Sequence, residues 1–287
     1  MMLKAKQKGF TLLELLVVIT LLAILSVGAL VAYDGLTEKA QASATANNTA
    51  SVDRAIRQYK VISQKFPDQW DNLGASGAGV ATGTVSLADS TKSWLANFGA
   101  STTGFASAAT ALEAAGVEEL QVAPDTIFAG VVPNLQHNEG ATSGASAEVD
   151  VDAVSNLAIV AAEGLGNKFN GSATTAADTQ KLNKINDAFE DDETNLVVAL
   201  GFGHDAAHST AGSKVAIAQA ATYTSANIDA SKNYARYIGL FLVGSSTGQG
   251  VAPAGLTYRD KALFVGIVDP EGNGIDDNIA AAVSVDN

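Results

Sequence analysis

A single carboxylate at the edge of an uncharged apolar run is the first feature of this sequence that could do chemistry. Glu14 is followed by residues 15–33, which contain no charged side chain and consist mostly of Leu, Val, Ile and Ala. About 19 apolar residues suffice for a helix to cross the ~30 Å hydrocarbon core of a bilayer. A charge at the centre of such a span costs roughly 2.5–3.5 kcal/mol, less near its end, and usually marks a functional contact. We therefore expect Glu14 to meet a positively charged partner.

A second group of oxygen-bearing side chains lies near the end of the chain. Its members are Asp269, Glu271, Asn273, Asp276 and Asp277. Alternating oxygen ligands followed by Gly274 are typical of the beginning of an EF-hand calcium loop. The twelfth position of that loop is Ala280, which cannot supply the bidentate carboxylate, so a complete EF-hand is excluded. A calcium site of another kind and a plain acidic turn between two strands both stay open.

The other polar clusters give weaker signals. His204 and His208 have the spacing at which two imidazoles share a metal ion on a helix, but the glycines around them make a helix doubtful and no third ligand is evident. The acidic run 190–193 is interpreted as a solvated helix end, with a cation site as the alternative.

No serine, histidine and aspartate combination has the context that hydrolysis requires. The sequence contains no cysteine, which excludes thiol catalysis and cysteine-bound metals. We expect a protein that is not an enzyme.

The residues before the apolar run determine its topology. Lys4, Lys6 and Lys8 predict that the N-terminus stays in the cytoplasm and that most of the chain lies across the membrane. Gly9 stands before the apolar run, whereas a secretory signal peptide has its small-residue cleavage site after a shorter apolar region. An ordinary unprocessed anchor remains the alternative, although it would gain nothing from Gly9-Phe10 or from Glu14.

The stretch Lys8-Gly9-Phe10-Thr11-Leu12-Leu13-Glu14 resembles the class III leader of type IV pilins and type II secretion pseudopilins. The resemblance implies that a membrane aspartyl peptidase, the prepilin peptidase, cuts between Gly9 and Phe10 and methylates the new amine of Phe10. It also implies that Glu14 is the glutamate used in assembly. A neighbour's Phe10 amine would neutralise Glu14 in a low-dielectric filament core, and a wrong register would leave both charges unpaired. Whether the pair forms within one chain or between chains stays open.

The elements that position these residues begin with one long helix. It is expected from about residue 11 to about residue 64, because Pro67 is the first proline and disfavours helix before it. Val52, Ile56, Tyr59 and Ser63 share one face of its second half, which predicts packing on a core. We divide the chain into a leader (1–9), a transmembrane and filament-core helix (10–33), an amphipathic continuation (34–65) and a globular head (66–287).

The head is expected to have an α+β fold of the pilin-like kind, with a C-terminal antiparallel sheet packed on the long helix and a helical and loop insertion. Trp70 and Trp94 are interpreted as packing anchors. Strands are predicted at 84–87, 127–132, 195–200, 236–243 and 262–268. Helices are predicted at 106–120 and 176–189. Two further segments, 151–162 and 279–285, are ambiguous between helix and strand.

Composition limits the partners. The net charge is −13, and without the three leader lysines the 17 − 3 = 14 basic residues face 30 acidic ones, giving −16. Nucleic-acid binding is not expected, because phosphates need clustered Lys and Arg. The resemblance implies a homo-oligomeric helical filament, the prepilin peptidase, an assembly platform membrane protein with its ATPase, and other minor pilins. It places the chain in the inner membrane as a single-pass protein, and later in a periplasmic or extracellular filament.

Three functions follow, in order of preference. The first is a type II secretion pseudopilin, because the resemblance associates such proteins with calcium in an acidic C-terminal loop and the chain lacks the cysteine pair of many surface pilins. The second is a pilin of a surface pilus used for adhesion, motility or DNA uptake, which the long head favours. The third is a membrane-anchored binding protein that keeps a pilin-type leader.

Overall fold

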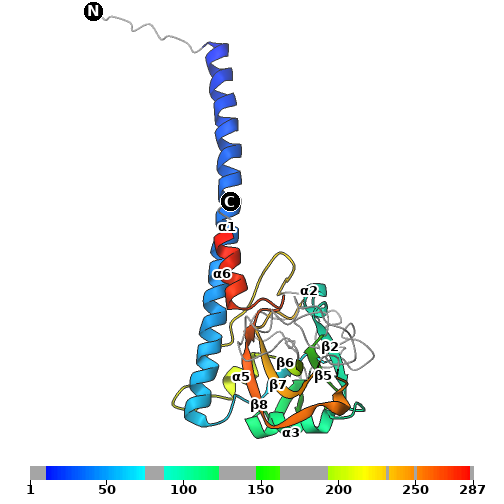
Figure 1. Cartoon of the computed structure of the whole chain (residues 1–287). Coiled ribbons are helices and arrows are strands. Elements are labelled where there is room, and N and C mark those ends of the chain that lie inside the picture. Colours follow the sequence, from blue (N-terminus) through cyan, green and yellow to red (C-terminus); the bar gives the residue numbers. More distant parts are fainter. Residues whose placement is uncertain are drawn as a thin grey trace, which may run out of the picture.

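The computed structural model describes residues 11–74, 87–122, 147–161, 193–230, 233–248 and 251–284. One long helix, α1, rises from a head that is built on a β-sheet, and its upper half stands clear of every other element (Figure 1). Gly9, Phe10 and the leader lysines lie outside the described residues. The structure confirms the expected α+β arrangement of a long apolar N-terminal helix followed by a sheet.

Helix α1 spans Leu12–Ser63, which is 52 residues or roughly 80 Å at 1.5 Å per residue. It begins at Thr11, whose side chain caps the first turn, and ends where Gln64 adopts a left-handed conformation at φ 60°. The predicted bounds of about 11 and 64 are therefore confirmed. In the lower half of α1, Val52 and Ile56 are buried against the head, as the apolar spacing predicted.

Within the described residues, the head contains one sheet of eight strands: β1 (Trp70–Asn72), β2 (Leu95–Gly99), β3 (Glu119–Val122), β4 (Ala147–Asp150), β5 (Asn156–Val160), β6 (Glu193–Gly201), β7 (Ile238–Thr247) and β8 (Thr257–Val268). The long strands β6, β7 and β8 form its antiparallel centre. The other edge of β6 pairs with β5 through Ile159 and Val198, and with β1 through Leu200 and Gly201. Strand β2 extends the sheet from β5, whereas β3 and β4 extend it from β1.

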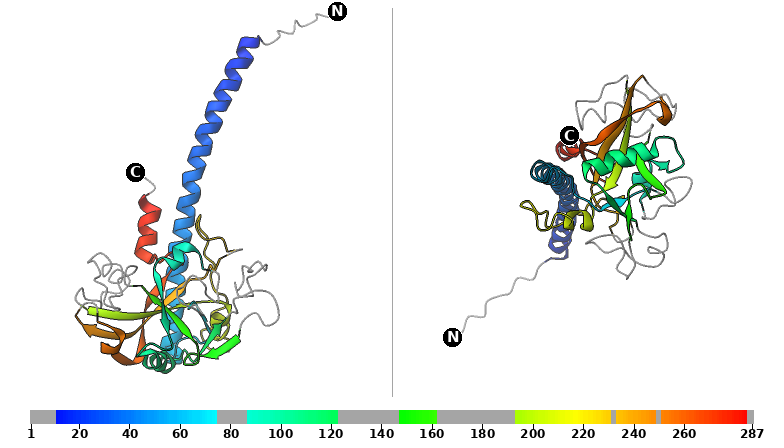
Figure 2. Two further views of the ribbon diagram at one scale, coloured as in Figure 1. Left: turned by 90° about the vertical axis from the view of Figure 1, so that its right-hand side faces the viewer. Right: turned by 90° about the horizontal axis from the view of Figure 1, so that it is seen from below.

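Short helices cover the sheet and α1. They are α2 (Asp89–Lys92), α3 (Phe105–Ala115), α5 (His204–His208), a 3-10 turn at Pro253–Gly255, and α6 (Ile275–Ser284). Helix α3 packs on β7 and β8, whereas α6 packs on α1. Figures 1 and 2 show α6 antiparallel to α1, with its C-terminal end directed toward the apolar N-terminal half of α1.

Two apolar clusters hold the head together. The larger contains α1, α3 and one set of strand side chains, and Trp70 lies within it, edge-on to Phe202 and Phe241 with ring centroids 5.1 Å apart in each case. The smaller contains Trp94, whose indole N–H donates to the carbonyl of Pro270 at 3.1 Å. Both tryptophans are buried, so their interpretation as packing anchors is confirmed.

Several predicted elements need correction. The sheet is mixed, because β1 and β3 are parallel. The predicted helix 106–120 ends at Ala115, where Gly116 takes φ 101°, and its last residues enter β3. The ambiguous segment 151–162 contains β5, and the segment 279–285 belongs to α6 as far as it is described. The strands predicted at 195–200, 236–243 and 262–268 are confirmed as β6, β7 and β8.

The middle of the chain was expected to be an insertion that enlarges the head. Its described residues supply β2, β3, β4 and β5 to the same sheet, so it is an integral part of one head. The predicted strand at 127–132, the predicted helix at 176–189, residues 84–86 of the predicted short strand and acidic residues 190–192 lie outside the described residues. Leu87, the last residue of that short strand, is described and lies in no strand.

Candidate functional site

The carboxylate of Glu14 folds back onto the start of its own helix. Its Oε2 accepts the backbone N–H of Thr11 at 2.8 Å and the Thr11 hydroxyl at 2.9 Å, while the N–H of Glu14 donates to Thr11 Oγ1 at 3.3 Å. This is a capping box, in which two orphan N–H groups of the first turn are satisfied reciprocally. The negative charge is thereby held at the positive end of the helix dipole, next to the place where the chain enters from Phe10.

The helix above the head has no protein neighbour among the described residues. Leu12–Leu30 is 19 residues long, wholly exposed, and apolar enough to cross a membrane. Its two central hydroxyl groups bond back to their own helix, Thr20 to the carbonyl of Leu16 at 3.0 Å and Ser26 to that of Leu22 at 2.7 Å. The segment therefore offers lipid or another helix an apolar surface with its polar groups satisfied internally.

Basic side chains fasten the lower half of α1 to the head. Arg57 pairs with Asp53 at 2.7 Å, donates from Nη2 to the carbonyl of Val265 in β8 at 3.1 Å, and lies 5.1 Å from the ring centroid of Phe264. Lys60 lies 4.5 Å from the ring centroid of Phe66, which is three residues beyond the last residue of the helix. These contacts fix the direction in which the apolar half of α1 leaves the head.

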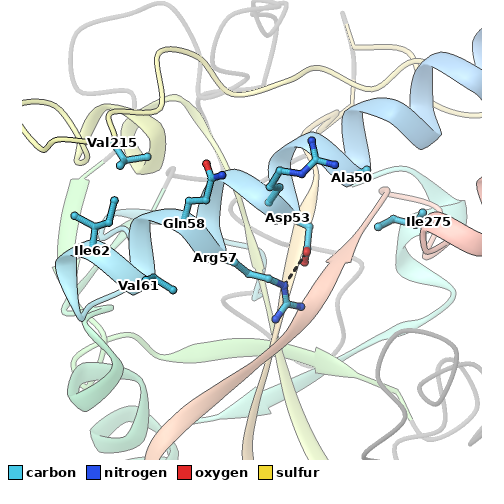
Figure 3. A pocket seen from close by; sticks show the side chains of 9 residues that line it. Ala50, Asp53, Arg57, Gln58, Val61, Ile62, Val215 and Ile275 are labelled. Atoms are coloured by element: carbon cyan, nitrogen blue, oxygen red, sulfur yellow. Dashed lines mark hydrogen bonds and ion pairs between the residues drawn. The ribbon is translucent and has the colours of Figure 1, made fainter.

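An open apolar groove of about 700 Å³ follows the exposed side of lower α1. Figure 3 shows it between the loop that carries Val215 and the first turn of α6 at Ile275, with Val61 and Ile62 at one end and Ala50 at the other. The exposed fractions of Val61 and Ile62 are 71% and 51%. Exposed aliphatic side chains beside a groove are typical of a surface that another chain covers.

The acidic loop before α6 is organised around its first residue. Asp269 is buried, and its Oδ1 accepts the backbone N–H groups of Glu271 at 2.9 Å and Asn273 at 3.0 Å. Burial raises the pKa of Asp269 to about 6, against the lowering effect of its hydrogen bonds with Asn273 and Asn278. Glu271 accepts from the hydroxyl of Tyr223 and from Asn227 Nδ2 at 2.7 Å.

The remaining two acidic residues of the loop belong to α6. Asp276 and Asp277 lie in its first turn, and Asp277 accepts the N–H of Gly274 at 3.4 Å. In the part of the chain that the structure describes, no three Asp, Glu or His side chains are grouped as metal ligands. The five residues named from the sequence thus lie in one loop and in the first turn of α6 that follows it. Calcium binding stays a prediction.

The histidine pair does lie on a helix, contrary to the doubt that the surrounding glycines raised. His204 and His208 form the two ends of α5, with parallel rings whose centroids are 5.9 Å apart. His204 Nδ1 lies 3.1 Å from Asp205 Oδ1. No third ligand joins them among the residues described.

Sequence reasoning missed a buried polar cluster in the head. Asp71 in β1 accepts the hydroxyl of Tyr234, and Arg236 lies buried beside them. Asp71 and Tyr234 are 163 positions apart in the sequence, and no local spacing links them. Gly201 and Gly203, which were noted only as glycines near the histidine pair, both face this cluster.

Comparison with known proteins gives one match. The family described as "Prokaryotic N-terminal methylation motif" matches residues 4–30. Neither the curated proteins nor the solved structures gave a match. The matched residues begin at the first leader lysine that we singled out, contain Thr11 and Glu14, and end at Leu30, where the exposed apolar span also ends. Residues 4–30 of this chain therefore carry the N-terminal methylation motif, the leader signature of type IV pilins and pseudopilins.

Proposed function

We propose that this protein is a structural subunit of a type IV pilus-like filament, and most simply a pseudopilin of a type II secretion machine. The observation that carries the proposal is the apolar span Leu12–Leu30, which is wholly exposed at the end of a helix whose other half packs on the head. So large an apolar surface needs lipid before assembly and other helices after it. Polymerisation through α1 supplies both environments in turn.

The first turn of α1 supports processing and assembly at its N-terminus. Cleavage between Gly9 and Phe10 would leave a positively charged amine one residue before the Thr11 cap. Glu14 is already turned toward that end of the helix by its two bonds from Thr11. A neighbour's Phe10 amine approaching along the helix axis would meet a carboxylate whose orientation is set in advance, which lowers the ordering cost of the pair.

The groove on lower α1 supports contact between copies. It is apolar, it follows the same helix, and parallel copies displaced along the axis would bring the span of one beside the groove of another. The sequence offers a clean test, because it contains no cysteine. Copies that carry Ile62→Cys and copies that carry a single cysteine at positions 15–25 are mixed in filaments and oxidised.

We expect disulfide-linked dimers for at least one position of the span. The control replaces Ile62→Cys by Ser107→Cys, at an exposed position of α3 in the same head, and should give no dimers with the same span cysteines. If no position of the span forms dimers with Ile62→Cys in assembled filaments, the span does not lie in this groove.

The partners follow from the leader. A pilin-type leader implies processing by prepilin peptidase and assembly into a filament. An assembly platform membrane protein, its ATPase and other minor pilins are proposed on the same grounds, with the chain inserted once in the inner membrane and its N-terminus in the cytoplasm. The head would then be periplasmic, or extracellular in a surface filament.

A surface pilin is the second candidate, and the size of the head favours it. Eight strands and the described helices build a head that presents much more surface than anchoring a shaft requires. The acidic C-terminal loop and the absence of cysteine favour the pseudopilin. Electron microscopy of cells that express the protein with its own machinery separates the two: surface filaments that contain the head indicate a pilin, and a periplasmic location with loss of secretion on deletion indicates a pseudopilin.

A further inference from the structure

The buried cluster of Asp71, Tyr234 and Arg236 joins two parts of the head that are far apart in sequence. Asp71 lies in β1, the first strand after α1, whereas Tyr234 and Arg236 lie in the segment that enters β7. The three residues are 2%, 2% and 0% exposed. Strand β1 is only three residues long, and it is held by two registered pairs with β3 and two with β6. Side chains therefore also hold this strand: Trp70 is buried in the core, Asn72 Nδ2 donates to the carbonyl of Asn156 at 3.0 Å, and Asp71 contacts Tyr234.

The hydrogen bonds of the cluster are incomplete. The Tyr234 hydroxyl donates to Asp71 Oδ2, while Asp71 Oδ1 has no partner among the described residues. Arg236 Nη1 donates to the carbonyl of Ala220 at 2.9 Å and to Thr222 Oγ1 at 2.7 Å, but its Nε and Nη2 are unpartnered in the same part of the chain. An ionised buried carboxylate needs several donors to offset its desolvation, and here it has one.

Two glycines make room for the carboxyl and phenol groups. A Cβ on Gly203 would lie 2.1 Å from Asp71 Oδ2, and a Cβ on Gly201 would lie 1.9 Å from the Tyr234 hydroxyl oxygen. Neither glycine has a positive φ, so close approach is the constraint at both positions. Gly201-Phe202-Gly203 is thus shaped around the Asp71–Tyr234 contact.

Charged or titratable groups near Asp71 come from two of the elements packed around it. The segment before β7 supplies Tyr234 and Arg236, and α5 supplies Asp205. The paired positions of β3 and β6 are Gln121 and Gly201, which carry no charge. Burial raises the pKa of Asp71 to about 7, and the Tyr234 hydrogen bond and the Arg236 charge oppose this rise. Burial also raises the pKa of Tyr234 well above its usual value, so the phenol stays neutral near pH 7.

We propose that Asp71 is a proton-sensitive latch that fastens β1, and with it the end of α1, to the head. The protonated carboxyl fills its place between Tyr234, Gly203 and Arg236 without the desolvation cost of the carboxylate, which outweighs the attraction of the Arg236 charge. The ionised carboxylate has a single donor, so β1 separates from α5 and from the segment before β7 more often. The latch acts on the joint between helix and head and operates whether or not the chain forms filaments.

Hydrogen–deuterium exchange of the full-length protein in detergent micelles tests the latch. Protection of peptides that cover 66–74 and 220–237 is measured from pH 6 to pH 8, above the pKa of about 6 to which burial raises Asp269, and corrected for the intrinsic exchange rate. One linked proton raises the opening equilibrium by up to about tenfold per pH unit below the folded pKa. We expect protection of both peptides to fall steeply up to about pH 7, while peptides from β7 and β8 stay protected.

Matched variants separate the latch from a general effect of pH. Asp71→Asn keeps the shape of the side chain and should make protection independent of pH, whereas Asp152→Asn, at an exposed position of the same head, should behave as the wild type. Tyr234→Phe removes the one donor to the carboxylate and should move the midpoint to higher pH, which gives a second test if Asp71→Asn does not fold. Protection that is constant in the wild type, a fall that persists in Asp71→Asn, or an unchanged midpoint in Tyr234→Phe would overturn the proposal.

Discussion

Arg57 of α1 reaches across to β8 and donates to the carbonyl of Val265 at 3.1 Å, with its guanidinium 5.1 Å from the ring centroid of Phe264. The same side chain pairs with Asp53 one helical turn earlier. A single residue thus links the long helix to the antiparallel centre of the sheet, through a charge-assisted hydrogen bond and a cation–π contact.

Replacement of Arg57 by alanine is expected to destabilise the head by about 1–3 kcal/mol, because both the hydrogen bond and the ring contact are lost. Urea unfolding of the full-length protein in detergent, followed by the fluorescence of buried Trp70 and Trp94, measures the change. Arg54→Ala is the control, since Arg54 is exposed on the same helix and should change the free energy of unfolding little. Equal losses of stability in Arg57→Ala and Arg54→Ala would contradict this role of Arg57.

The long elements were predictable because their signals are local. The bounds of α1 follow from Thr11 and Glu14 at one end and Pro67 just beyond the other, and β6, β7 and β8 follow from long apolar runs. The short strands were missed because their stability comes from distant partners. Strand β1 has only three residues, and nothing near it in sequence predicts that it pairs with β3 and β6.

The first turn of α1 and the buried Asp71 cluster differ in the same way in how far the sequence predicts them. Glu14 could be singled out as a candidate because a charge beside an apolar run can be recognised from the order of the residues alone. The Asp71 cluster could not be recognised in this way, because its hydrogen bond joins residues 163 positions apart and the glycines that make room for it, Gly201 and Gly203, carry no local signal of that contact. The helix predicted to run to residue 120 failed for a local reason, since Gly116 at φ 101° ends α3 and was passed over.

Substitutions of Glu14 separate its two roles. Glu14→Ala removes the capping box and the charge, and we expect leader cleavage to continue while incorporation into filaments is lost. Glu14→Gln keeps an acceptor for the Thr11 N–H but loses the charge, so it should fail in assembly as well. Immunoblots of sheared filaments and of the processed subunit measure the two steps, with Glu148→Ala, exposed in β4, as the control. Normal assembly of Glu14→Gln would show that capping, not charge pairing, is what matters.

Gly203→Ala is expected to destabilise the head by roughly 1–3 kcal/mol or more, because the added Cβ would lie 2.1 Å from Asp71 Oδ2. Gly244→Ala in β7 is the matched control, since its nearest contact would be 3.3 Å from a Tyr258 side-chain atom. The double variant with Asp71→Ala removes the clash, so its loss of stability should be smaller than the sum of the two single losses. If the losses of stability of the two single variants add up in the double variant, the cost of Gly203→Ala does not come from a clash with Asp71.

The acidic loop gives a direct test of the calcium prediction. If an ion binds, the melting temperature of the protein rises with calcium and falls with chelator, since a ligand that binds only the folded state stabilises it. Binding would require Glu271 to leave Tyr223 and Asn227, so Glu271→Gln should weaken the response. Identical melting with calcium and with chelator would leave the loop as a turn held by Asp269 and by the Trp94 contact to Pro270.

The free energy of unfolding is expected to fall between pH 6 and pH 7. Asp71 ionises near 3.8 in the unfolded chain but at about 7 in the folded one. Between these values folding takes up a proton, so rising pH disfavours the folded state by at most about 1.4 kcal/mol per pH unit, and the dependence ends above pH 7. Asp269, with its pKa raised to about 6, acts in the same direction but only below that pH. Urea unfolding at pH 6 and pH 7 should therefore show the fall in the wild type and in Asp269→Asn and lose it in Asp71→Asn; a fall that survives Asp71→Asn would have to come from another group.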